Sequence, residues 1–179
     1  IMNKPYPWLT YNFINYFITQ DLKDKTLLEL GSGESTIFWA DYFKKVYSYE
    51  SDSDWIQKLN NEYEIPNNVE INETGNAIFE DAKFLTYVKN CDYIIIDNDI
   101  HTMPRKHYAQ YVITHKKEDS QIILDNGTWN YEAYMFLLKH FFCLDFPGIN
   151  ITKQTTVTSL FFERKAEKYF NNYESYFNR

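Results

Sequence analysis

The stretch TLLELGSGESTIFWADYFKKVYSYE, at residues 26–50, constrains the fold more than any other part of this chain. It opens with a short apolar run of buried-strand length and breaks into the glycine turn GSGES at 31–35. Apolar residues at helical spacing follow, and a second apolar run closes the stretch on Glu50. The order strand, glycine turn, helix, strand and acid predicts a βαβ unit.

The glycine turn and the acid together favour a nucleoside site. Gly31 and Gly33 allow the backbone N–H groups at the following helix start to approach a ligand, because no Cβ intervenes. Glu50, at the end of the second strand, lies where a ribose would sit if a nucleoside lay across the strand ends. An ordinary βαβ unit with a glycine turn and no ligand is the alternative.

The residue at position 36 separates two kinds of nucleoside site. The dinucleotide fingerprint GxGxxG needs a third glycine there, and Thr36 therefore weakens the alternative of an NAD-dependent oxidoreductase. The run ELGSGES at 29–35 instead resembles the first motif of class I S-adenosylmethionine-dependent methyltransferases, an acid followed by GxGx[GST]. The resemblance implies a glycine loop packed against the methionine part of the cofactor. It implies cofactor contacts at Glu29, Gly31, Ser32, Gly33, Ser35, Thr36, Glu50 and Ser51.

Composition excludes several other classes. The 179 residues fit a single domain, and the 19% aromatic content predicts aromatic-rich packing or an aromatic-lined pocket. A net charge of −7 disfavours nucleic acid as a partner, because phosphate binding draws on clustered Lys and Arg. No apolar run reaches the ~20 residues of a membrane span and no signal stretch opens the chain. We therefore expect a soluble, cytoplasmic protein without a membrane partner.

Two later apolar strands also end in acids. The run YIIID at 93–97 is typical of a central parallel strand, and its last residue, Asp97, would reach the crevice at the strand ends. The run QIILDN at 121–126 repeats this pattern. Between the βαβ unit and these strands, Gly75 and Asn76 occupy the place where class I methyltransferases often carry a turn that contacts adenine. A plain turn into the next helix, at 77–88, is the alternative.

The resemblance implies an α/β, Rossmann-like fold with a mostly parallel seven-stranded sheet, helices on both faces and a C-terminal antiparallel hairpin. Strands at 141–146 and 157–162, with a turn at Pro147-Gly148, would form this hairpin. We expect one domain, 1–179, with a helix at 8–21 and an amphipathic helix at 165–178 as appendages. We interpret the last helix as docked on its own domain, and a homodimer contact is the alternative.

A second, local resemblance concerns metal. Asp97 with the pair Asp125-Asn126 resembles the metal triad of the cation-dependent catechol and caffeoyl-CoA O-methyltransferases. Three hard oxygen ligands suit Mg²⁺, which would hold and acidify two adjacent acceptor hydroxyls. That family carries a lysine base three residues beyond the first acid, where this chain has Ile100. Carboxylates that cap the next helices are the alternative.

The broadest resemblance spans nearly the whole chain. The runs LGSGESTIFWA at 30–40, IID at 95–97 and TSLFF at 158–162 are similar to a group of small class I methyltransferases often encoded near surface-glycan biosynthesis enzymes. We expect methyl transfer from S-adenosylmethionine to an oxygen of a small-molecule or glycan acceptor. Asp97 would face the sulfonium, and His101 would be the base, since imidazole accepts a proton at neutral pH. A non-catalytic cofactor-binding subunit is the alternative.

Overall fold

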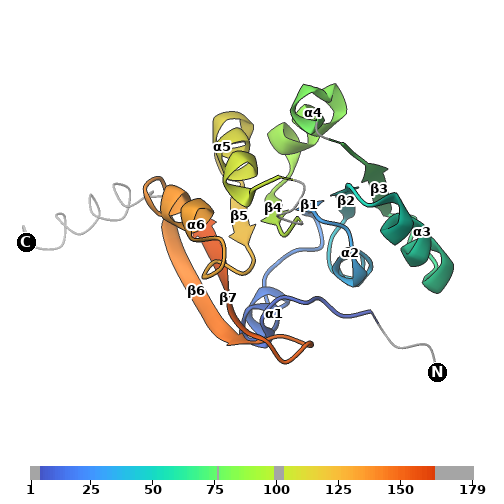
Figure 1. Ribbon diagram of the computed structural model, residues 1–179, viewed down its shortest axis with the longest axis horizontal. Coiled ribbons are helices and arrows are strands. Elements are labelled where there is room, and N and C mark those ends of the chain that lie inside the picture. Colours follow the sequence, from blue (N-terminus) through green and yellow to red (C-terminus); the bar gives the residue numbers. More distant parts are fainter. Residues whose placement is uncertain (1–4, 76, 99–102, 164–179) are drawn as a thin grey trace, which may run out of the picture.

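The computed structural model describes residues 5–75, 77–98 and 103–163. These residues form a seven-stranded sheet and the helices around it (Figure 1). Its strands are β1 (Thr26–Leu30), β2 (Lys45–Glu50), β3 (Val69–Glu73), β4 (Tyr93–Ile96), β5 (Gln121–Leu124), β6 (Phe142–Ile149) and β7 (Thr155–Phe162). Its helices are α1 (Tyr11–Phe17), α2 (Glu34–Trp39), α3 (Ser53–Glu62), the 3₁₀ helix η1 (Ile78–Glu80), α4 (Ala82–Asn90), α5 (Arg105–His115) and α6 (Tyr131–Leu138).

The strand order is β3-β2-β1-β4-β5-β7-β6. Strands β1 to β5 pair in parallel, whereas β7 runs antiparallel to both β5 and β6. The predicted mostly parallel, Rossmann-like sheet with a C-terminal antiparallel hairpin is therefore confirmed. After β1 the chain builds outward to β2 and β3, and then returns to add β4 on the other side of β1. Ligands of open α/β sheets bind at such a switch point.

Alternating side chains of the central strands enter two hydrophobic cores, one on each face of the sheet. In β4, Ile94 and Ile96 belong to the core under α4, α5 and α6. Ile95 belongs to the core under α1 and α2, which includes Phe17 and Trp39. Strands buried on both faces need apolar residues at every position. This requirement explains the continuous apolar runs and confirms helices on both faces.

The register of the central strands places their carboxyl ends at one level. Leu30 of β1 pairs with Ile96 of β4, which pairs with Leu124 of β5. The ladder continues one residue further, because Asp97 N donates to Leu30 O at 2.9 Å and Asp125 N donates to Ile96 O at 3.3 Å. The glycine loop and the two acids therefore meet at the same edge of the sheet.

The turn of the C-terminal hairpin differs from the sequence prediction. β6 continues through Pro147 and Gly148, which pair with β7, and the chain turns only after Ile149. β6 is the edge strand of the sheet, where a proline without an N–H is tolerated. The turn forms instead around Asn150, whose Oδ1 accepts from the N–H groups of Thr152 at 3.0 Å and Gln154 at 3.1 Å.

The remaining differences concern helix ends. α1 is shorter than the predicted 8–21 and begins after Thr10, whose hydroxyl accepts from Phe13 N. The helix expected at 77–88 is divided into η1 and α4, because Asp81 caps the start of α4 through Lys83 N. The predicted helix at 165–178 lies outside the described residues. Within the described ranges, no helix is long and apolar enough to cross a membrane.

Candidate functional site

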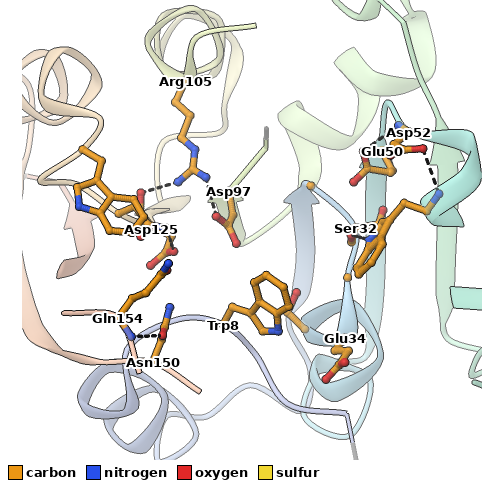
Figure 2. Close-up of a pocket in the computed structure, with 16 residues that line it drawn as sticks. Trp8, Ser32, Glu34, Glu50, Asp52, Asp97, Arg105, Asp125, Asn150 and Gln154 are labelled. Atoms are coloured by element: carbon orange, nitrogen blue, oxygen red, sulfur yellow. Dashed lines mark hydrogen bonds and ion pairs between the residues drawn. The ribbon is translucent and has the colours of Figure 1, made fainter. Parts of the chain in front are cut away.

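A cleft of about 490 Å³ opens at the carboxyl ends of β1, β2, β4 and β5, at the switch point of the sheet (Figure 2). Its walls come from the glycine loop, the strand ends, the start of α5, the segment before α1 and the β6–β7 turn. They are formed by Trp8, Gly31, Ser32, Gly33, Glu34, Ser35, Glu50, Asp52, Trp55, Asp97, Arg105, Asp125, Asn126, Trp129, Asn150 and Gln154.

The two glycines of the loop have different roles. Gly31 has a φ of +98°, and a Cβ at this position would lie 2.6 Å from the carbonyl oxygen of Asp97. A side chain there would therefore separate the ends of β1 and β4. At Gly33 a Cβ would meet nothing closer than 3.7 Å. Gly31 is required by packing, whereas Gly33 leaves the backbone open toward the cleft.

Glu29 and Thr36 lie beneath the loop, and neither lines the cleft. Both are fully buried. The Thr36 hydroxyl donates to Glu29 Oε2 at 2.5 Å and accepts from Gly33 N at 2.9 Å, so it ties the loop to β1. Burial raises the pKa of Glu29 to about 8, which leaves this acid mostly protonated at neutral pH. These residues support the loop from below.

Glu50 and Trp55 form the far side of the glycine loop. Glu50 Oε1 accepts from Ser51 N at 2.7 Å and from Asp52 N at 2.9 Å, which fixes the carboxylate at the edge of the cleft. Trp55 Nε1 donates to Ser32 O at 2.7 Å, so the indole is held against the loop. Figure 2 shows Glu50, Asp52 and Ser32 together on this side.

Arg105, the first residue of α5, joins the ends of β4 and β5. Its guanidinium donates from Nη2 to Asp97 Oδ1 at 2.8 Å, from Nη1 to Asp125 O at 2.6 Å and from Nε to Asn98 O at 3.0 Å. Figure 2 shows it reaching down between the two acids. The side chain is 8% exposed. A buried cation therefore stands between the two predicted acids.

Asp125 is held more tightly than Asp97. Its Oδ1 accepts from the Thr158 hydroxyl at 2.6 Å, and its Oδ2 accepts from the side-chain amide of Asn126. Burial, followed by the negative charge of Asp97, raises the pKa of Asp125 to about 7. Burial also raises the pKa of Asp97, against the opposing effect of Arg105. The edge of the sheet thus carries a buried acid, Asp125, and a half-buried acid, Asp97, with Arg105 paired to Asp97 and bonded to the Asp125 carbonyl.

The structure gives no support to the predicted Mg²⁺ site. Both carboxylate oxygens of Asp125 accept hydrogen bonds, Asn126 Oδ1 accepts from Thr156 Oγ1 at 3.0 Å, and Asp97 is ion-paired with Arg105. Most of the side-chain oxygens that a hard cation would need are therefore already bonded within the protein. In the described part of the chain, no three His, Cys, Asp or Glu side chains form a group that could hold a metal ion. In place of an open metal triad, the structure shows an acid–arginine–acid cluster, and the Mg²⁺ assignment stays an unsupported prediction.

The cleft brings together most of the residues predicted from sequence. Those that line it are Gly31, Ser32, Gly33, Ser35, Glu50, Asp97, Asp125 and Asn126. Ser51 and Gly75 do not line it, although Ser51 N supports the Glu50 carboxylate. Asn76 and His101 lie outside the described residues, and their assignments stay predictions.

Sequence reasoning missed Arg105 and the aromatic walls. A cation in the first turn of a helix opposes the helix dipole, so an arginine directly after Pro104 indicates a nearby carboxylate. Trp8 and Trp129 received no site role from the sequence, yet both line the cleft and are 51% and 59% exposed. The sequence holds no clear signal for them, because a tryptophan in a loop or at a helix start can be either buried or exposed.

Comparisons with known proteins agree with this geometry. No protein-family model and no curated protein matches the sequence. A candidate O-methyltransferase structure from Klebsiella pneumoniae is 17% identical, with a TM-score of 0.65 over 86% of this chain and 78% of that one. An rRNA methylase from Streptococcus thermophilus is 15% identical, with a TM-score of 0.59 over 92% and 99%.

A third match has been solved with a ligand. The N-methyltransferase NodS from Bradyrhizobium japonicum is 12% identical, with a TM-score of 0.58 over 86% of this chain and 97% of that one. A further structure of NodS, at 10% identity and a TM-score of 0.55, contains S-adenosyl-L-homocysteine and matches over 79% of each chain. The chain therefore has the fold of class I S-adenosylmethionine-dependent methyltransferases, as its motifs predicted.

Proposed function

We propose that this protein transfers a methyl group from S-adenosylmethionine to a hydroxyl oxygen of a small-molecule or glycan acceptor. The observation that carries the proposal is that the glycine loop and Glu50 line one cleft at the switch point of a methyltransferase-type sheet. The NodS structure with S-adenosyl-L-homocysteine supports the choice of donor.

The charges of the cleft suit this donor. Four acidic side chains, Glu34, Glu50, Asp52 and Asp97, line it together with Asp125, whose charge is reduced by its raised pKa. An excess of acids favours a ligand that carries positive groups, as the sulfonium and ammonium of S-adenosylmethionine do. Glu50, with Oε1 already fixed by two backbone N–H groups, would accept from the ribose hydroxyls.

An NAD-dependent oxidoreductase receives less support. Dinucleotide-binding sheets commonly have the order 3-2-1-4-5-6 and a third glycine in the loop. This sheet inserts an antiparallel β7 between β5 and β6. Thr36 replaces the third glycine, and its hydroxyl is bonded to Glu29. The third glycine of that fingerprint allows close helix–strand packing, and the bonded Thr36 side chain fills this position here.

When bound, S-adenosylmethionine supplies an electrophilic methyl group on its sulfonium sulfur. The protein has to align the acceptor oxygen and remove its proton. We assign Asp97 to hold the acceptor hydroxyl, because it lines the cleft and Arg105 fixes its carboxylate. We assign His101 as the base that takes the proton. His101 follows Asp97 by four positions in the sequence, and its assignment stays a prediction because it lies outside the described residues.

A screen of hydroxylated acceptors tests the activity, with release of S-adenosylhomocysteine as readout. His101→Ala is expected to lower kcat by ~10²- to 10⁴-fold, the usual contribution of a general base. His107→Ala is the matched control, because His107 is exposed on α5 and does not line the cleft. Tight cofactor binding without turnover on any acceptor would favour the non-catalytic subunit instead.

A further inference from the structure

Two exposed tryptophans and two amides are among the residues that line the cleft. Trp8 lies in the segment before α1, Trp129 in the loop between β5 and α6, and Asn150 and Gln154 in the β6–β7 turn. Figure 2 shows Asn150 and Gln154 beside Asp125, on the opposite side of the cleft from Glu50. We call Trp8, Trp129, Asn150 and Gln154 the aromatic-amide subsite.

We propose that the aromatic-amide subsite binds the ring of a neutral sugar, which presents its hydroxyl as the methyl acceptor. This inference rests on the proposed function and names its substrate class. An aldopyranose has a face of C–H groups that packs on an indole and a rim of hydroxyls that both donate and accept hydrogen bonds. Indoles and side-chain amides offer these complementary surfaces.

The amide of Asn150 is prepared for such a ligand. Asn150 is 3% exposed and lines the cleft. Its Oδ1 accepts from Thr152 N at 3.0 Å, from the Thr152 hydroxyl at 2.7 Å and from Gln154 N at 3.1 Å. The side chain is thus fixed by its oxygen, and among the residues the structure describes no group bonds its Nδ2, which can donate to a ligand.

Gln154 adds a second amide close to the acids. Figure 2 shows its side chain extending toward Asp125. Within the described residues the structure gives this amide no hydrogen-bond partner, so it can serve a ligand. A sugar hydroxyl between this amide and the Asp97 carboxylate would have both a donor and an acceptor within reach. The subsite therefore continues directly into the position assigned to the reacting oxygen.

The charges of the cleft select against acidic sugars. Arg105 is the one cation among the described lining residues, and it is buried and bonded to Asp97 and to two carbonyl oxygens. A phosphate or carboxylate on the acceptor would meet the acidic lining without a free counter-charge. A flat phenol would pack on an indole but would offer the amides of Asn150 and Gln154 fewer hydrogen-bonding groups than a sugar does.

The proposed step balances without a further reactant. The sugar hydroxyl loses its proton to the base, and its oxygen forms the new O–CH₃ ether bond. The S–CH₃ bond of the donor breaks, and its electron pair remains on sulfur. The products are a methylated neutral sugar and S-adenosylhomocysteine.

Saturation-transfer NMR tests the subsite on the whole protein with S-adenosylhomocysteine present. The probes are methyl glycosides of glucose, galactose, mannose, rhamnose, fucose and N-acetylglucosamine. At least one should bind, and Trp8→Ala should weaken it about tenfold through loss of stacking. Tyr131→Ala is the matched control and should bind like the wild type, because Tyr131 is a 63% exposed aromatic that does not line the cleft.

Glucuronate, galactose 6-phosphate and catechol are the comparison probes, and each should bind more weakly than the best neutral glycoside. The proposal is overturned if no neutral glycoside binds, if Trp8→Ala binds them like the wild type, or if a comparison probe binds best. A separate titration with S-adenosylhomocysteine alone tests the proposed function. If it binds and the glycosides do not, the sugar subsite alone is wrong, whereas its failure to bind contradicts the methyltransferase itself.

Discussion

Gly31 and Gly33 stand two positions apart in the same loop, but replacing them by alanine should destabilise the protein to different extents. Gly31→Ala places a Cβ 2.6 Å from a backbone oxygen at a φ of +98°. We expect it to lower the free energy of unfolding by about 2–5 kcal/mol, from backbone strain and overpacking together. Gly33→Ala has space for its methyl group and should cost less than about 1 kcal/mol. Urea unfolding measures the stability of both variants. An equal loss of unfolding free energy in Gly31→Ala and Gly33→Ala would contradict this assignment.

Glu29 should make the protein less stable as pH rises. The pKa of this acid is 4.5 in its ordinary state and about 8 in the fold, because of burial. Between these values the folded state holds a proton that the unfolded state has released, so the free energy of unfolding falls with rising pH. Each pKa unit corresponds to about 1.4 kcal/mol, so the total is a few kcal/mol.

Glu29→Gln removes this titration. Urea unfolding between pH 5 and pH 8 should show a clearly smaller fall in stability for the variant than for the wild type. The remaining slope would come partly from Asp125, whose pKa is raised to about 7. Identical slopes in the two proteins would show that Glu29 is ionised in the folded state at neutral pH.

At the scale of elements, Arg105 holds α5 and the ends of β4 and β5 together. Arg105→Ala would leave the Asp97 carboxylate without its counter-charge, and we expect a loss of about 3–5 kcal/mol. The adjacent Lys106 is the control, because its pair with Glu132 has side chains 38% and 77% exposed and is worth less than about 1 kcal/mol. Thermal unfolding measures both variants. A midpoint temperature that falls no further for Arg105→Ala than for Lys106→Ala would refute the role of this cluster.

The same cluster leads to a prediction about metal. Among the residues expected to bind Mg²⁺, the side-chain oxygens of Asp125 and Asn126 accept hydrogen bonds and Asp97 Oδ1 is paired with Arg105. Turnover should therefore be unchanged by chelator and by added Mg²⁺. If a chelator stopped turnover and added Mg²⁺ recovered it, the predicted metal triad would be correct, and Arg105 would have to move to free Asp97.

For the whole molecule, the sheet could be predicted because its signals are local. Each central strand is a continuous apolar run that ends in Gly31, Asp97 or Asp125, and burial on both faces requires such runs. The prediction of a turn at Pro147-Gly148 was wrong because β6 is an edge strand, where proline is tolerated. The local sequence does not show which strand lies at the edge.

The parts of the site that the sequence did not predict depend on contacts between distant segments. Arg105 meets Asp97 and Asp125 only after β4, β5 and α5 have assembled, and no spacing in the sequence indicates that pairing. Trp8 reaches the cleft because Thr10 N is bonded to the Thr158 hydroxyl at 3.0 Å, which anchors the first segment to β7. Contacts of this kind follow from topology and not from local pattern.

The central claim is that the cleft binds S-adenosylmethionine, and isothermal titration of the whole protein tests it directly. S-adenosylhomocysteine should bind, NAD should give no heat, and Glu50→Ala should weaken S-adenosylhomocysteine by about tenfold or more through loss of a charge-assisted hydrogen bond. Binding of NAD in place of S-adenosylhomocysteine, or an affinity for S-adenosylhomocysteine that Glu50→Ala leaves unchanged, would contradict the account.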